Sequence, residues 1–263
     1  RLLRASTKHW LRAGALLVLC GCGRIGFDPR AALIDGGLGD GVMGSNDGAI
    51  GSNDGASDVA PADAGIPADF GNLGESSYLK ASNVGGADAF GRSVAVFGNT
   101  LVVGAPNERS GSGGVNGNEE DNSELSAGAA YVFVLQDGEW VQEAYLKAEE
   151  PSNGDYFGST VAIFEDTIVV GAPNDDTPNS QTGSAYVFVR SNGAWSQQAF
   201  LRASNFAVGD HFGSILSLSG DTLAVGAVDE GSAATGVNGN EDDTSEISSG
   251  AVYVFTRSGT QWS

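Results

Sequence analysis

Short apolar runs separated by glycine and polar residues recur from about residue 78 to the end of the chain. In each set the first run begins with Phe-Gly, the second contains Gly-Ala, and the third carries Tyr-Val-Phe. The runs are short and rich in β-branched and aromatic residues, which predicts β-strands and no helices. They cover residues 90–95, 101–106 and 130–133, then 157–162, 168–173 and 185–188, then 212–217, 223–228 and 252–255.

A tryptophan follows each third run, and a fourth apolar run closes the first two sets. The tryptophans are Trp140, Trp195 and Trp262, the fourth runs are residues 145–148 and 200–203, and residues 78–82 match this run but precede the first Phe-Gly. Because the tryptophans recur at one position of the repeat, we expect them to pack between repeats rather than to bind a sugar.

Two polar or glycine residues separate the first run from the second, which predicts tight hairpins at Gly98-Asn99, Glu165-Asp166 and Gly220-Asp221. Four antiparallel strands in a repeated unit are typical of a β-propeller blade. The sequence therefore predicts an all-β fold, a β-propeller of four-stranded antiparallel blades, of which about three are present. We expect the inner and middle strands to be buried on both faces by neighbouring blades, and the glycines beside the apolar runs to allow close backbone approach.

Composition excludes several classes of function. The 263 residues include 33 Asp and Glu but 13 Lys and Arg, for a net charge of −20, so binding to nucleic acid is excluded. There are 2 His and 2 Cys, and His9, Cys20 and Cys22 all lie near the start of the chain. Catalytic triads, zinc clusters and disulfide frameworks are thereby excluded from the repeats, and we expect no enzyme activity there.

Residues 1–21 have the pattern of an export signal. Basic residues precede an apolar run, 13–20, that is too short to span a bilayer. The sequence Leu19-Cys20-Gly21-Cys22 resembles a bacterial lipobox, so we predict lipidation of Cys22 and anchoring to the outer membrane or cell surface, with an ordinary secretion signal as the alternative. Residues 22–77 are rich in Gly, Ala and Asp, which predicts a disordered spacer.

The Phe-Gly and Gly-Ala-Pro pairs resemble FG-GAP repeats, the blades of integrin α-subunit propellers and of many secreted bacterial proteins. The resemblance covers residues 78–263. It implies a seven-bladed extracellular propeller that serves adhesion or ligand binding without catalysis. Integrin-type repeats often carry a calcium loop between the Phe-Gly and Gly-Ala-Pro strands. This chain has only two-residue turns there, and the resemblance therefore does not imply that calcium site. Since a ring needs more blades and the sequence starts without Met, we expect the chain to be part of a longer protein.

Two long and nearly identical segments, residues 114–133 and 236–255, are the candidate ligand-binding loops, whereas the middle repeat has a short loop at 174–183. Their oxygen-bearing side chains suit Ca²⁺, the one cofactor that the sequence suggests. The alternative is that these residues form Asx turns in solvated loops. The candidate ligands are Asn116, Asn118, Asp121 and Glu124 in the first loop, and Asn238, Asn240, Asp243 and Glu246 in the second.

A carboxylate precedes Phe-Gly in every repeat, at Asp88, Asp155 and Asp210. A residue that recurs in each blade favours a structural turn over acid/base catalysis. His211 follows the last of them, and we expect an exposed or hydrogen-bonded ring.

Three functions remain open. The leading hypothesis is a non-enzymatic cell-surface lipoprotein that binds a protein or glycan through its loops and contacts the membrane through the lipid anchor alone. The second is an accessory propeller of a longer secreted hydrolase or lyase. The third is a structural envelope protein without a specific ligand.

Overall fold

The computed structural model describes residues 77–176 and 181–263. The predicted signal peptide, nearly all of the predicted spacer and Cys22 lie outside these residues. Over the described ranges the chain forms three four-stranded antiparallel sheets, which confirms the all-β blade architecture. No helix within these ranges is long and apolar enough to cross a membrane.

Each sheet is one blade, and its strands follow one another in chain order. Blade 1 contains β1 (Ser93–Phe97), β2 (Thr100–Ala105), β3 (Ala129–Gln136) and β4 (Glu139–Leu146); blade 2 contains β5 (Thr160–Phe164), β6 (Thr167–Ala172), β7 (Ser184–Ser191) and β8 (Ala194–Leu201); blade 3 contains β9 (Phe212–Ser219), β10 (Thr222–Ala227), β11 (Ala251–Ser258) and β12 (Gln261–Trp262).

The predicted two-residue hairpins are present in all three blades. Phe97 pairs with Thr100 in blade 1, and the equivalent pairs close the first hairpins of blades 2 and 3. The first turn residue has a positive φ each time: 55° at Gly98, 50° at Glu165 and 58° at Gly220. These compact turns explain why a short polar pair suffices between the first and second strands.

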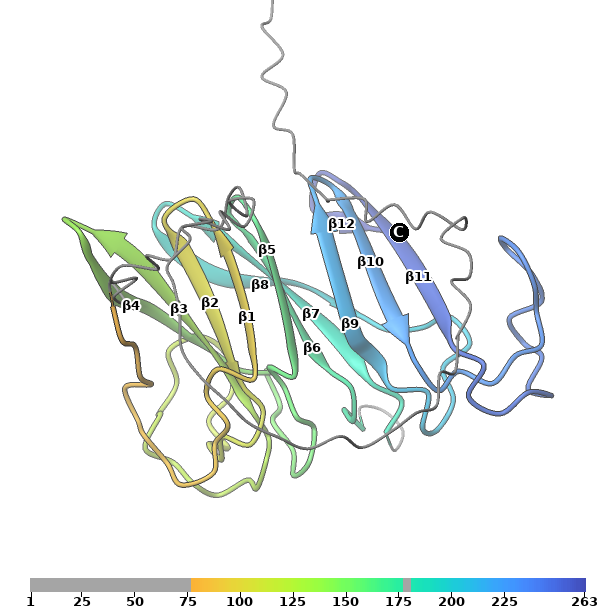
Figure 1. Cartoon of the computed structure of the whole chain (residues 1–263), viewed down its shortest axis with the longest axis horizontal. Coiled ribbons are helices and arrows are strands. Elements are labelled where there is room, and N and C mark those ends of the chain that lie inside the picture. Colours follow the sequence, from red (N-terminus) through yellow and green to blue (C-terminus); the bar gives the residue numbers. More distant parts are fainter. Residues whose placement is uncertain (1–76, 177–180) are drawn as a thin grey trace, which may run out of the picture. The chain divides into compact units, whose positions relative to one another are not determined.

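The first strands of neighbouring blades, β1, β5 and β9, contact one another, as the inner strands of propeller blades do. Figure 1 shows the tight hairpins at the top of the blades and the longer connections at the bottom. The connections between second and third strands leave the blades at that lower end, which we call the loop end. All candidate ligand residues belong to it.

Neighbouring blades meet through glycines near the inner strands. A Cβ atom on Gly104 would lie 2.0 Å from the carbonyl oxygen of Gly158, and one on Gly171 would lie 2.1 Å from that of Gly213. The Ser93 hydroxyl donates to the same Gly158 oxygen at 2.8 Å. The Gly-Ala glycine of one blade therefore contacts the Phe-Gly glycine of the next, as expected for close backbone approach.

The second strands are packed on both faces where a blade has two neighbours. In β6, Ile168 and Val170 pack in the cluster shared with blade 1, whereas Val169 packs in the cluster shared with blade 3. The expectation of burial on both faces is wrong for β1, where Val94 and Val96 are exposed, and for β11, which alternates between half-buried and exposed residues. The reason is that blades 1 and 3 each have one face with no neighbouring blade within the described residues.

The tryptophans lie at blade contacts. Trp195 is buried in the cluster between blades 1 and 2, and its Nε1 donates to Glu143 of β4 at 2.8 Å. Trp262 of blade 3 donates in the same way to Gln198 of β8 at 3.0 Å. Packing between blades is thus confirmed for both residues, and a stacking platform for sugars is not needed to explain them.

Candidate functional site

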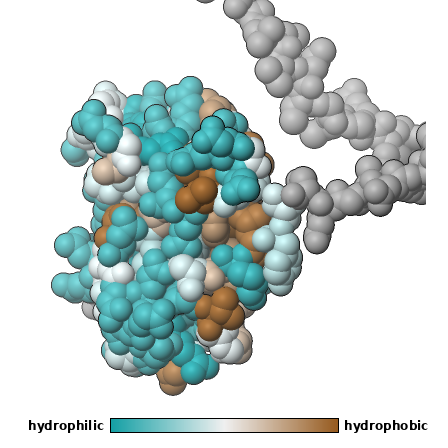
Figure 2. Space-filling view, turned by 90° about the vertical axis from the view of Figure 1, so that its left-hand side faces the viewer, coloured by the Kyte–Doolittle hydropathy of each residue, from teal (hydrophilic) through white to brown (hydrophobic). Residues whose placement is uncertain are grey.

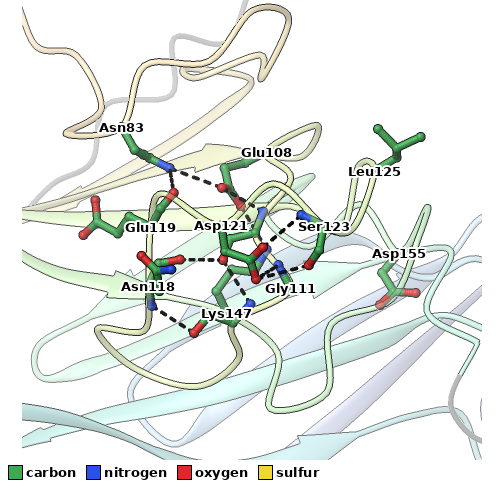
Figure 3. A network of polar contacts seen from close by, with 12 residues as sticks. Asn83, Glu108, Gly111, Asn118, Glu119, Asp121, Ser123, Leu125, Lys147 and Asp155 are labelled. Carbon is green, nitrogen blue, oxygen red and sulfur yellow. Dashed lines mark hydrogen bonds and ion pairs between the residues drawn. The ribbon is translucent and has the colours of Figure 1, made fainter.

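A buried ion pair anchors the long loop of blade 1, which runs from the end of β2 to the start of β3. The Lys147 ammonium lies 2.9 Å from Glu108 Oε2, and the two side chains are 0% and 2% exposed. Glu108 Oε1 also accepts hydrogen bonds from the Ser110 amide at 3.0 Å and from Asn83 Nδ2 at 3.2 Å (Figure 3). Burial lowers the pKa of Lys147, while Glu108 opposes this shift. Pairing with several donors is what makes a buried carboxylate tolerable.

The loop is also paired with the chain that leaves β4. The Gly114 amide donates to the Ala148 carbonyl at 3.0 Å, and the Lys147 amide donates to the Gly114 carbonyl at 2.9 Å. Asn116, a predicted ligand, has φ 55°, and its Oδ1 accepts the Tyr145 amide at 2.9 Å. Its side-chain oxygen therefore satisfies a backbone donor.

Two further predicted ligands hold the tip of the loop. Asn118 Oδ1 accepts the Glu120 amide at 3.3 Å. Asp121 accepts the Gly111 amide at 3.2 Å and the Ser123 amide at 3.0 Å (Figure 3). These contacts have the form of the Asx turns that were the structural alternative.

Glu124, the fourth predicted ligand, is half-buried, and its backbone amide donates to the Arg109 carbonyl at 2.9 Å. The four side chains thus come from one loop, but three of them hydrogen-bond to backbone amides of the loop or of β4. Calcium binding by this set stays a prediction.

Blade 3 repeats this loop with small differences. Asp243 accepts the Ala233 amide at 3.2 Å and the Ser245 amide at 3.0 Å, and the hydrogen bonds from Ser245 hold its pKa below the ordinary value. Asn238 has φ 54°, Asn240 accepts the Asp243 amide through its carbonyl at 3.4 Å, and the Glu246 amide donates to Gly231 at 3.0 Å. The second loop therefore repeats the backbone contacts of the first at these positions and the side-chain contacts of Asp121, while Glu246 is exposed where Glu124 is half-buried.

A pocket of about 570 Å³ lies beside this second loop and includes Glu230, Asn238 and Tyr253 in its lining. In blade 1 the outer edge of the third strand is covered by β4, which pairs along it from Ala130 to Gln136. We therefore assign the pocket to the open edge of β11 and not to a preformed ligand cavity.

Sequence reasoning missed the residues that hold the loops in place. Glu119 accepts a hydrogen bond from Ser82 and another from Gln142 at 3.1 Å, and so links the loop to β4. Glu230 of blade 3 is buried and accepts Asn205 Nδ2 at 3.1 Å, as Glu108 accepts Asn83. An acidic residue recurs in the sequence shortly after each Gly-Ala pair, and this recurrence could have pointed to Glu108 and Glu230.

The carboxylates before Phe-Gly are structural, as predicted. Oδ2 of Asp88, Asp155 and Asp210 accepts the amide three residues earlier, at 2.7, 2.8 and 2.6 Å. Burial raises the pKa of all three. His211 has a hydrogen-bonded ring, with Nδ1 2.7 Å from Asp229 Oδ2, and this contact lowers the pKa of Asp229.

One acidic cluster was not predicted. A carboxylate oxygen from each of Asp155, Asp175 and Asp176 lies within 4.8 Å of the others. Asp155 and Asp175 are buried, and Asp176 is exposed. Burial first, and then the charge of Asp175, raise the pKa of Asp155 to about 7.

The calcium loop of integrin-type repeats does not fit this chain. It lies between the first and second strands, and here the strands are joined by two residues in each blade. A two-residue turn supplies too few oxygen ligands for Ca²⁺, which takes six to eight.

Comparison with known families gives one match. The model of the FG-GAP repeat matches residues 74–133, 140–188 and 195–255, which together exceed half of the chain. Each matched segment contains the first two strands of one blade and ends within its third strand, and the second and third segments begin in the fourth strand of the preceding blade. No curated protein sequence matches the chain.

Proposed function

The chain belongs to the FG-GAP repeat family, and from this premise we propose that it is a non-enzymatic cell-surface lipoprotein that acts in adhesion. Its propeller blades bind a protein or a glycan through the long loops of blades 1 and 3, and Ca²⁺ assists this contact. Cys22 carries the lipid that attaches the exported chain to the bacterial envelope. The membrane is contacted through this anchor alone, and nucleic acid is not a partner.

The observation that carries the proposal is the preorganisation of the two long loops. Hydrogen bonds to Asn118 and Asp121, together with the buried Glu108–Lys147 pair, hold the first loop in one conformation. At the same time Glu120 and Leu125 remain exposed. A loop that is ordered before binding loses little conformational entropy when it contacts a ligand.

The surface supports a polar mode of recognition. Figure 2 shows the side of the molecule that faces left in Figure 1, and it is mainly hydrophilic with small, separate hydrophobic patches. The net charge of −20 adds a strong negative field. Such a surface favours basic protein patches, or glycans bridged through Ca²⁺, over an extended apolar partner.

The test is a binding screen of the full chain in detergent against protein and glycan arrays, with and without Ca²⁺. The loop variant Glu120→Gln/Asp242→Asn removes one exposed carboxylate at the same position of each loop. The control Asp137→Asn/Glu139→Gln removes two exposed carboxylates from the β3–β4 hairpin, away from the loop end.

We expect saturable binding that the loop variant weakens at least about tenfold, or roughly 1.4 kcal/mol, and that the control retains. Absence of saturable binding to either array overturns the proposal in favour of a structural envelope protein. Equal effects of both variants overturn the assignment of binding to the loops.

The anchor is tested separately by metabolic labelling with palmitate. Cys22→Ala is expected to abolish labelling and release the chain from the membrane fraction, whereas Cys20→Ala is expected to retain both. Labelling that survives Cys22→Ala would refute the lipid site.

A further inference from the structure

The three blades carry the same pair of acidic positions at the loop end. In each blade the residue after Gly-Ala-X donates its amide to the carbonyl of the Asp before Phe-Gly: Asn107 to Asp88, Asn174 to Asp155 and Asp229 to Asp210. The next residue is Glu108, Asp175 or Glu230, and all three are buried. The blades can therefore be compared position by position.

Blades 1 and 3 compensate this acidic pair with basic groups. In blade 1, Lys147 pairs with Glu108, and the charge of Arg109, the next residue, partly offsets the rise in the pKa of Asp88 that burial causes. In blade 3, the residue after Glu230 is the uncharged Gly231, and His211 partly offsets the rise in the pKa of Asp210 that burial causes.

Blade 2 has a third carboxylate, Asp176, at the position of Arg109. Lys147, which interacts electrostatically with Asp155, is already paired with Glu108 at 2.9 Å. The guanidinium of Arg202, the residue equivalent to Lys147, lies over the Phe206 ring at 4.4 Å. The acidic positions at the loop end of blade 2 therefore carry more uncompensated negative charge than the equivalent positions of blades 1 and 3.

A second observation concerns a single oxygen atom. Asp155 is 2% exposed, and its Oδ2 accepts the Ser152 amide. Its Oδ1 is buried and makes no hydrogen bond of ordinary geometry within the described residues; the Asp176 amide lowers the pKa of Asp155, but burial outweighs this effect. A buried carboxylate oxygen without a donor is costly, unless a cation supplies the missing interaction.

We propose that Asp155, Asp175 and Asp176 form a Ca²⁺ site in blade 2. The carboxylate oxygens lie within 4.8 Å of one another, a span that two oxygens bound to one Ca²⁺ at about 2.4 Å each can have. Water completes the coordination on the exposed side of Asp176. This site uses none of the candidate ligands of the long loops, although Gly154 and Tyr156 on either side of Asp155 donate their amides to the blade 1 loop. It does not depend on the proposed function.

The test measures Ca²⁺ and Tb³⁺ binding to the full chain and its variant Asp155→Asn. Asparagine can still accept the Ser152 amide, so the turn is kept while one charge is removed. The matched control is Asp210→Asn, the same change at the equivalent position of blade 3. Tyr186 donates to Asp175 through its hydroxyl and serves as a built-in sensitiser for Tb³⁺ luminescence.

We expect Asp155→Asn to weaken Tb³⁺ and Ca²⁺ binding by at least about tenfold, the lower end of the cost of losing a supporting contact at a metal site. Saturating Ca²⁺ should raise the Tm of the wild type and of Asp210→Asn by roughly 5–10 °C. Saturating Ca²⁺ should leave the Tm of Asp155→Asn unchanged. In EDTA the variant should be at least as stable as the wild type, because a repulsive charge is gone; this shows that it folds.

Asp176→Asn, a change at an exposed position, is a second variant and should also weaken binding. If Asp155→Asn keeps the full response to Ca²⁺, the site is refuted. If the response disappears in Asp121→Asn/Asp243→Asn but not in Asp155→Asn, the metal belongs to the long loops. If neither Ca²⁺ nor Tb³⁺ binds the wild type, no such site exists.

Discussion

Replacing Lys147 by Met should strongly destabilise blade 1, because it leaves the Glu108 carboxylate buried without its counter-charge. The pair lies at 2.9 Å with side chains 0% and 2% exposed. Removing one partner of such a pair costs about 3–5 kcal/mol in proteins. Two neutral donors, the Ser110 amide and Asn83 Nδ2, remain on the carboxylate. We therefore expect a loss of about 3 kcal/mol in the free energy of unfolding.

The assay is equilibrium urea denaturation of the full chain at pH 7.5, followed by tryptophan fluorescence. The double variant Glu108→Gln/Lys147→Met removes both charges and should lie within about 1 kcal/mol of the wild type, because no unpaired charge stays buried. Lys80→Met is the matched control: it occupies the equivalent position before blade 1 but is exposed, so it should change stability by less than about 0.5 kcal/mol.

A loss below about 1 kcal/mol for Lys147→Met would refute the reasoning. So would a double variant that is as unstable as the sum of its single changes, since the charges would then not be coupled.

Two more predictions concern the blade contact and pH. Gly104→Ala should cost about 1–3 kcal/mol by urea denaturation, because its Cβ would lie 2.0 Å from the Gly158 oxygen; Gly86→Ala, with no atom within 4 Å, is the control, and equal effects would contradict the close approach. In EDTA, stability should fall as pH rises from about 4 through 7, because the pKa of Asp155 is raised from 3.8 to about 7 and its protonated form is favoured in the folded state. Thermal unfolding across this range should show a smaller fall for Asp155→Asn, and an identical fall would contradict the assignment.

The strands and hairpins were predictable because their signals are local. Apolar runs and two-residue turns such as Gly98-Asn99 determine a hairpin within a few residues of sequence. The buried pair was not predictable in this way, since Glu108 and Lys147 are 39 positions apart and meet only after the blade has formed. Both appear as ordinary charged residues in the sequence.

The two long loops were predictable from the sequence, but the contacts of their side chains were not. Asn116 and Asp121 use their side-chain oxygens to accept backbone amides, and calcium binding stays a prediction. The sequence shows how many oxygen-bearing side chains the loops carry, but not where each oxygen points. That direction decides whether the oxygen closes a turn or binds a metal. The cluster around Asp155 was missed because each blade's Asp was considered alone.

The contact between Gly104 and Gly158 brings main chain against main chain, and the Ser93 hydroxyl donates to the same Gly158 oxygen. The same close approach recurs between Gly171 and Gly213, where the Thr160 hydroxyl takes the place of the Ser93 hydroxyl. A duplicated gene segment that encodes one blade therefore brings both halves of this contact with it, whatever loop it carries. The family can diversify its loops without redesigning how its units join.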